Sequence, residues 1–208
     1  MLAGSLSVWA PLITAWLSMV PPKTAMGTVV ATHYTALFTS LYSTAEARLG
    51  LAIRGNNAAA ARKAVVEDGA DANKAVFDRW TVMGGTCTAA YVAAMWGHTA
   101  ALGAVLDAPG VDPNKGNTRN GWTPCHTACI GKNPDAVTLL LARGADPNRA
   151  DKNGITPCIL AALVGATACL RALAEGAAQQ GRALDVDAVA TVGSWAGMAA
   201  LDLSLIHI

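Results

Sequence analysis

The sequence predicts an all-α solenoid built from stacked helix–turn–helix units that are joined by hairpin loops. Three observations lead to this prediction. Short motifs recur with a period of about 33 residues. Within each period, helix-start and helix-stop residues mark two helical segments. No single pair of such short helices can bury its apolar face alone, so the units must stack on one another.

The period is visible in two aligned stretches. Gly121-Trp-Thr-Pro-Cys matches Gly154-Ile-Thr-Pro-Cys 33 residues later, and Asp112-Pro-Asn returns at Asp146 after 34 residues. Further upstream, Gly69-Ala-Asp-Ala-Asn has the pattern of Gly144-Ala-Asp-Pro-Asn. Several motifs that recur in the same order make chance a poor explanation for the repeat.

Each unit begins with an inner helix. The Thr123 hydroxyl is a good helix N-cap, and Pro124 suits the first helical position because its missing N–H is not needed there. The segment Asn133-Pro134-Asp135 applies the same chemistry to the second helix of the unit. Asp135 also lies at the positive end of that helix dipole.

The second helix continues with a packing stripe and ends at a glycine. Val137, Leu140 and Leu141 fall at helical spacing and predict the buried face. Arg143 suits the negative end of the helix, and Gly144 favours a left-handed stop. The residues after it, including Asp146 and Asn148, favour a turn into the hairpin.

These motifs resemble the ankyrin repeat, with its Gly-x-Thr-Pro-Leu-His opening and its Gly-Ala-Asp-x-Asn end. The resemblance covers about residues 46–203. Three units are recognisable, at 86–118, 119–151 and 152–184, and a partial unit precedes them at 46–76. A further unit opens near 197–203, so the predicted array, 46–208, has about four units and an incomplete last one.

Some positions depart from the ankyrin pattern. Ala89 replaces the usual Pro, and Tyr91 and Ile159 replace the usual His. About six extra residues lie between Asn73 and Thr88, and about nine surround 179–184. We expect both insertions to enlarge hairpin loops.

Residues 1–45 have a different composition and form a predicted apolar N-terminal extension. No charged residue occurs in 2–20, which leaves a membrane span or a signal segment open as interpretations. Against both, no Lys or Arg precedes the stretch and Pro11 interrupts it. A non-native start is another alternative, and we expect a poorly ordered extension.

Composition excludes some functions and favours a cytoplasmic location. Charged residues make up 14% of the chain, against roughly 25% in typical soluble proteins. The formal net charge is +1, which argues against nucleic-acid binding. Five cysteines without a small-domain disulfide framework indicate reduced thiols inside the cell.

No catalytic, metal or cofactor site is predicted. His126 is the most tempting residue, but the resemblance implies that it braces adjacent hairpins through hydrogen bonds. Cys125 and Cys158 occupy an apolar slot, so Cys125, His126 and Cys129 are interpreted as structural and not as zinc ligands. Gly131-Lys132 lacks the pattern of a phosphate loop, and Val192 breaks a nucleophile elbow at Ser194. We therefore expect no enzyme activity from these residues.

The resemblance implies that an unidentified protein partner binds at the hairpin tips and the inner helices. Mapping by motif position gives the following candidates: Met95, Trp96, Arg119, Asn120, Trp122, Ile130, Lys152, Asn153, Ile155, Leu163 and Val164. Trp96 and Trp122 are the expected anchors, because large aromatics often dominate interfaces. We expect Trp122, at a hairpin tip, to add little to packing between units. The alternative is that these apolar residues pack against the two insertions or a neighbouring unit.

Two other functions remain open. Residues 204–208 end the chain just as a unit opens, which favours a fragment, so the array is alternatively the targeting region of a larger enzyme truncated at Ile208. The other alternative is a membrane-tethered ankyrin protein, with membrane contact only through residues 2–20.

Overall fold

The computed structural model describes residues 44–74 and 86–186. Helices are the only regular elements in these two ranges, which confirms the all-α prediction. In chain order they are α3 (Ala45–Arg54), α4 (Ala58–Val66), α5 (Ala89–Trp96), α6 (Thr99–Leu106), α7 (Pro124–Ile130), α8 (Pro134–Ala142), α9 (Pro157–Leu163) and α10 (Thr167–Gln179).

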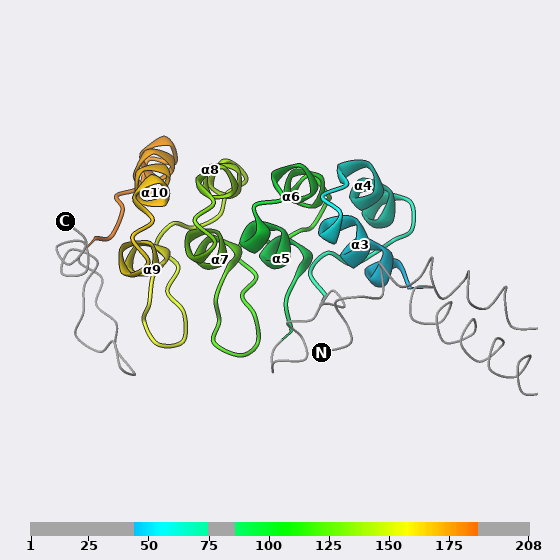
Figure 1. Ribbon diagram of the computed structural model, residues 1–208, viewed down its shortest axis with the longest axis horizontal. Helices are drawn as coiled ribbons and strands as arrows, with labels where there is room; N and C mark the ends of the chain where they lie inside the picture. The colour runs from blue at the N-terminus through cyan, green and yellow to red at the C-terminus, as the bar shows by residue number, and fades with distance from the viewer. Residues whose placement is uncertain (1–43, 75–85, 187–208) are drawn as a thin grey trace, which may run out of the picture.

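The helices form four pairs stacked in a line (Figure 1). We name the pairs unit 1 (α3 and α4), unit 2 (α5 and α6), unit 3 (α7 and α8) and unit 4 (α9 and α10). The inner helices α3, α5, α7 and α9 contact one another in sequence, and the outer helices α4, α6, α8 and α10 form a second row. Long loops connect unit 2 to unit 3 and unit 3 to unit 4, and they project on the side of the inner row.

The inner helices begin where the sequence predicts. Thr88 and Thr156 are N-cap residues, and their hydroxyls each accept a bond from a backbone N–H three residues later, at 3.3 Å. Thr123 caps α7 through a capping box with His126. Pro124 and Pro157 occupy the first helical position, where no N–H is required. Capping chemistry that repeats with the period therefore sets the phase of the units.

The outer helix of unit 3 also follows the prediction. Val137, Leu140 and Leu141 are all buried, so they form the packing face of α8. Gly144 then adopts a left-handed conformation with φ of 86°, which ends the helix at low steric cost. The core is continuous through all four units and consists largely of alanine, which lets the helices approach closely.

The outer helix of unit 4 is extended towards the second predicted insertion. The outer helix α10 has 13 residues, against nine in α8. Its last turn packs near α8, where a Cβ on Gly176 would lie only 2.3 Å from Leu141 Cδ1. The helix ends at Gln179, and residues 180–186 lie outside it. The hairpin that was expected to be larger continues beyond the described residues, so that expectation stays a prediction. Most of the first insertion, residues 75–85, lies outside the described residues.

One predicted feature is more complete than expected, and two others lie outside the described residues. The expected partial unit at 46–76 contains a complete helix pair, α3 and α4. The unit expected to open near 197–203 and almost all of the extension 1–45 lie outside the described residues. Within the described ranges, no helix is both long enough and apolar enough to cross a membrane.

Candidate partner-binding surface

Three apolar side chains form a row along the ends of the inner helices. Met95, Ile130 and Leu163 occupy the same register position in α5, α7 and α9, and each is half-buried. Unit 1 has Arg54 at this position. We call Met95, Ile130 and Leu163 the apolar row. The three side chains form a row because stacking places the C-terminal ends of α5, α7 and α9 next to one another.

Two further candidates flank this row. Trp96 is half-buried, and its ring meets the His98 ring edge-on at a centroid distance of 5.5 Å. His98 in turn contacts the Ile53 carbonyl of unit 1 through Nδ1 at 2.7 Å. Val164, at the C-cap of α9, is half-buried and packs against the core. Trp96 is thus held in place by a contact that joins units 1 and 2.

The hairpin candidates lie on two adjacent loops that are bonded together. Arg119 and Lys152 are exposed and occupy equivalent positions, whereas Asn120 and Asn153 are half-buried. The Lys152 N–H donates to the Asn120 carbonyl at 3.0 Å, and Lys152 Nζ donates to the Thr118 carbonyl at 2.7 Å. The two hairpins therefore present one continuous edge.

Trp122 has a structural role of the kind that the alternative interpretation described. Its indole Nε1–H donates to Asp151 Oδ2 of the next hairpin at 3.0 Å, and the ring is half-buried against the core. Asp151 also accepts bonds from the backbone N–H groups of Asn153 and Ile155. Trp122 thus bonds to the next hairpin. This contact agrees with the alternative of packing against a neighbouring unit and not with the expectation that Trp122 adds little to such packing.

Ile155 is not a surface residue. Its exposed fraction is 6%, and its backbone carbonyl accepts bonds from Asp151 N and His126 Nε2. Ile155 occupies the register position of Trp122 one unit later. Its smaller aliphatic side chain is buried in the core. Ile155 therefore belongs to the packing and drops out of the candidate surface.

The remaining candidates fall into two strips at opposite ends of the inner helices. Every residue from Pro124 to Cys129 in α7 and from Pro157 to Ala162 in α9 is buried. The corresponding stretch of α5, Ala89 to Ala94, is buried as well. A helix rises about 1.5 Å per residue, so the hairpin strip and the apolar row are about 10 Å apart. A partner that touches both must lie along the inner row.

His126 is a buried brace, as the resemblance implied. The backbone N–H of Thr123 donates to its Nδ1 at 3.1 Å, so Nε2 carries the proton and donates to the Ile155 carbonyl at 2.9 Å. Burial lowers the pKa of His126 to about 4. The ring is neutral near pH 7 and both nitrogens are occupied, which leaves no site for acid–base work on a substrate.

The five cysteines, all in the described ranges, are buried thiols. Burial raises the pKa of Cys125 to about 12 and that of Cys158 to about 11. A hydrogen bond with Cys169, together with burial, raises the pKa of Cys129. Thiols of this kind are protonated near neutral pH, and protonated thiols are poor nucleophiles and poor metal ligands. Within the described residues, no group of three His, Cys, Asp or Glu side chains is arranged to hold a metal.

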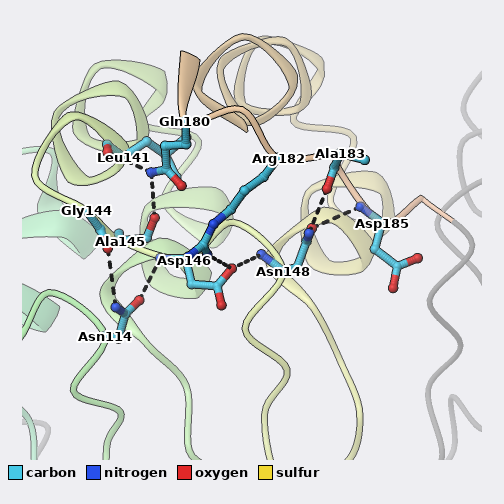
Figure 2. Close-up of polar contacts among 10 residues, drawn as sticks. All are labelled: Asn114, Leu141, Gly144, Ala145, Asp146, Asn148, Gln180, Arg182, Ala183 and Asp185. Carbon is cyan, nitrogen blue, oxygen red and sulfur yellow. Dashed lines mark hydrogen bonds and ion pairs between the residues drawn. The ribbon is translucent and has the colours of Figure 1, made fainter. Parts of the chain in front are cut away.

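Asparagine side chains connect the bases of the hairpins. Asn114 Oδ1 accepts from the Asp146 N–H at 2.7 Å, and its Nδ2 donates to the Gly144 carbonyl (Figure 2). Asn148 repeats both bonds one unit later, with the Asp185 N–H at 2.9 Å and the Ala183 carbonyl at 2.8 Å. We call Asn73, Asn114 and Asn148 the asparagine ladder, since Asn73 makes the same pair of bonds to unit 2.

Polar side chains of unit 4 reinforce the last junction. Gln180 Nε2 donates to the Leu141 and Ala145 carbonyls, each at 2.8 Å, and so satisfies groups at the end of α8 (Figure 2). Arg182 pairs with Asp146 at 3.1 Å. The sequence singled out Asp146 and Asn148 only as turn formers. Their contacts with the next unit were missed, although the Asp-x-Asn spacing in three units was the signal that could have shown them.

Comparison with known protein families agrees with this geometry. A family model described as ankyrin repeats, in three copies, matches residues 90–183, which span units 2 to 4. Residues 90–183 are ankyrin repeats. The described helices before them, α3 and α4, extend the same stack by one unit. Ankyrin repeats are generally protein-interaction modules and are typically not catalytic.

The curated relatives match only a short part of this chain. The chain is 48% identical to 2-5A-dependent ribonuclease of Mus musculus over 54 residues, 26% of this chain and 7% of that protein. It is 48% identical to the Homo sapiens protein of the same name over 56 residues, 27% and 8% of the two chains. Zinc finger CCCH domain-containing protein 24 of Oryza sativa subsp. japonica is 42% identical over 69 residues, 32% and 9%. The matching segment thus spans less than a tenth of these relatives.

Proposed function

We propose that the ankyrin array binds a partner protein through the apolar row and the bonded hairpin edge. The observation that supports this most is the register of the row. Met95, Ile130 and Leu163 keep apolar side chains half-buried at one position in three consecutive units. Packing within a unit does not require this, since unit 1 has Arg54 at the same position.

The chemistry of the surface fits a protein partner better than a charged polymer. The row offers methionine and branched aliphatic groups, and Trp96 lies beside it; such side chains are typical of interface cores. The hairpin edge adds Arg119 and Lys152 as an exposed rim. The overall net charge of +1 gives little long-range attraction for an anionic polymer. The buried thiols support a reducing, cytoplasmic location.

The proposal is tested with one charged substitution in the row. Met95→Arg places in unit 2 the residue that unit 1 already has at this position, so the fold should tolerate it. Partner proteins are first captured with the wild-type chain and identified, and the affinity of one of them is then measured. We expect Met95→Arg to weaken that affinity about tenfold or more, a loss of roughly 1.4 kcal/mol.

The matched control is Thr138→Arg on the outer helix α8. Arg62 and Arg171 occupy the same register position as Thr138 in units 1 and 4, so this change also copies a residue from another unit. We expect Thr138→Arg to bind with wild-type affinity. Equal affinity for wild type and Met95→Arg would contradict the proposal and would mean that the partner binds elsewhere on the protein.

A second function has a specific observation in its favour. The relatives of highest identity reported above include a ribonuclease whose name states dependence on 2-5A, and the matching segment is a small part of it. The array would then be the regulatory or targeting region of a larger enzyme. The test is to add 2-5A to the full chain and to measure the unfolding temperature of the protein. A rise with ligand concentration would support this function, and an unchanged unfolding temperature would count against it. A membrane-tethered protein remains a further alternative and rests only on residues 2–20.

A further inference from the structure

The first unit of the array leaves a stacking position open. Leu51 in α3 has an exposed fraction of 39%. Its register equivalents in the later inner helices are Val92, Thr127 and Leu160, and all three are at most 4% exposed. This position faces the preceding unit, as the bond from the Thr127 hydroxyl to the Tyr91 carbonyl shows. Leu51 therefore lies on a surface that every later unit buries.

The outer helix repeats the pattern. Ala60 in α4 is exposed, whereas its equivalents Ala101, Ala136 and Cys169 are fully buried. Cys169 Sγ lies 4.0 Å from the Ala128 carbonyl of the preceding unit, so this position also faces backwards along the stack. Both helices of unit 1 thus present a stacking face at the blue end of the described array (Figure 1).

Leu51 and Ala60 lie in a groove of about 610 Å³ between α3 and α4. Ala52 and Gly55 continue its apolar lining. Its charged border includes Arg48 and Asp68, which pair with each other at 2.9 Å. An uncharged occupant would therefore leave this ion pair intact and would bring no charge of its own into the groove.

We propose that residues 2–20 of the same chain pack into this groove and act as the N-terminal cap of the array. The stretch 2–20 contains no charged residue and is rich in leucine, valine and tryptophan, which suits the lining of the groove. Covering Leu51 and Ala60 would give unit 1 the burial that units 2 to 4 obtain from their neighbours.

The tether favours this segment over a second copy of the chain. Residues 21–43 link it to Thr44, the N-cap of α3. A chain of that length can span at most about 76 Å, and the ten residues of α3 extend about 15 Å. The segment can therefore reach the whole groove. A segment in the same chain meets the groove intramolecularly, at an effective concentration that does not fall when the protein is diluted, whereas binding of a second molecule does.

The test uses the full chain with one charge placed in the groove. Leu51→Glu puts a carboxylate on the stacking face, and hydrogen–deuterium exchange of peptides from residues 2–20 is followed by mass spectrometry. We expect exchange in these peptides to rise tenfold or more. The matched control is Val66→Glu, because Val66 is 64% exposed on α4 and its equivalents Asp107, Ala142 and Glu175 are exposed in every unit. That variant should exchange like wild type.

Several outcomes would overturn the proposal. One is equal exchange of residues 2–20 in all three proteins. Another is a dimeric mass by light scattering that Leu51→Glu returns to the monomer, because a second copy would then cover the groove. If Leu51→Glu also removes protection from α3, the milder Leu51→Thr, which copies Thr127 of unit 3, replaces it. A smaller rise in exchange of 2–20 then supports the cap, and wild-type exchange refutes it.

Discussion

His126 shows how one buried side chain makes the fold sensitive to acid. Its Nδ1 accepts from a backbone N–H and its Nε2 donates to a carbonyl, so the neutral ring satisfies both of its partners. A second proton on Nδ1 would point at the Thr123 N–H, which is also a donor. The folded state therefore disfavours the charged ring, in agreement with the lowered pKa.

Because of this residue, the free energy of unfolding should decrease when the pH is lowered. The pKa of His126 is about 4 in the folded chain, below the ordinary value of 6.5, so the unfolded chain binds more protons between these values. Stability is then fully present above pH 6.5 and is lost as the pH falls towards 4. Urea denaturation at pH 7 and pH 5 should differ by about 2 kcal/mol.

The control for this measurement is His126→Gln. Glutamine suits the third position of a capping box and does not titrate, so the variant keeps the helix start while it removes the proton site. Its stability should change far less between pH 7 and pH 5. The same pH dependence in both proteins would assign the effect to other groups.

Some residues could be predicted from the sequence and others could not, for a physical reason. Thr123, Pro124 and Gly144 act on their own helix ends, so local motifs were sufficient to place them. Trp122 and Ile155 share one register position, but one is half-buried and bonded to Asp151 while the other is buried. That difference depends on the neighbouring hairpin, and no local pattern encodes it.

At the scale of elements, the longest helix is the informative one. Its extra turn lies against α8, where Gly176 leaves room for Leu141 and Gln180 bonds the end of the helix. The sequence placed inserted residues around 179–184, whereas the structure has much of the added helical length before them, in the last turn of α10. Helix was favoured because this turn finds a packing surface on α8, which only the assembled units provide.

Gly176→Ala should destabilise the array, although the same change usually stabilises a helix by about 0.5–1 kcal/mol. The new Cβ would lie 2.3 Å from Leu141 Cδ1 and 2.9 Å from Leu141 Cβ, so α10 must move away from α8. We expect a loss of about 1–3 kcal/mol in the free energy of unfolding, measured by urea denaturation. The double variant with Leu141→Ala should relieve the clash and show positive coupling. A gain in stability for the single variant would mean that α10 and α8 are not this close.

At the scale of the whole molecule, stability is shared among junctions between units. Each unit contacts only its neighbours, so the total is close to a sum of unit and junction contributions. The asparagine ladder contributes two hydrogen bonds to each junction between described units. Weakening one junction should therefore loosen one end of the molecule without unfolding the other.

Asn148→Asp tests this at the last junction. The carboxylate keeps the acceptor for the Asp185 N–H but loses the donor to the Ala183 carbonyl, which leaves two oxygens facing each other. We expect a loss of about 1.4 kcal/mol at that junction, which corresponds to roughly tenfold faster hydrogen exchange in α10. Exchange in α5 and α6 should be unchanged. An equal increase in all helices would show that the array opens as one cooperative body.

The ladder also has a direction, because each asparagine bonds to the hairpin that follows it in the chain and presents the same two atoms every time. A tandem duplication in the gene that copies one whole period of about 33 residues would give the new copy matching partners on both sides. A duplication of any other length would separate the asparagines from the N–H and carbonyl groups to which they bond. The architecture therefore tolerates changes in copy number only in whole steps, which gives evolution a simple route to longer or shorter surfaces.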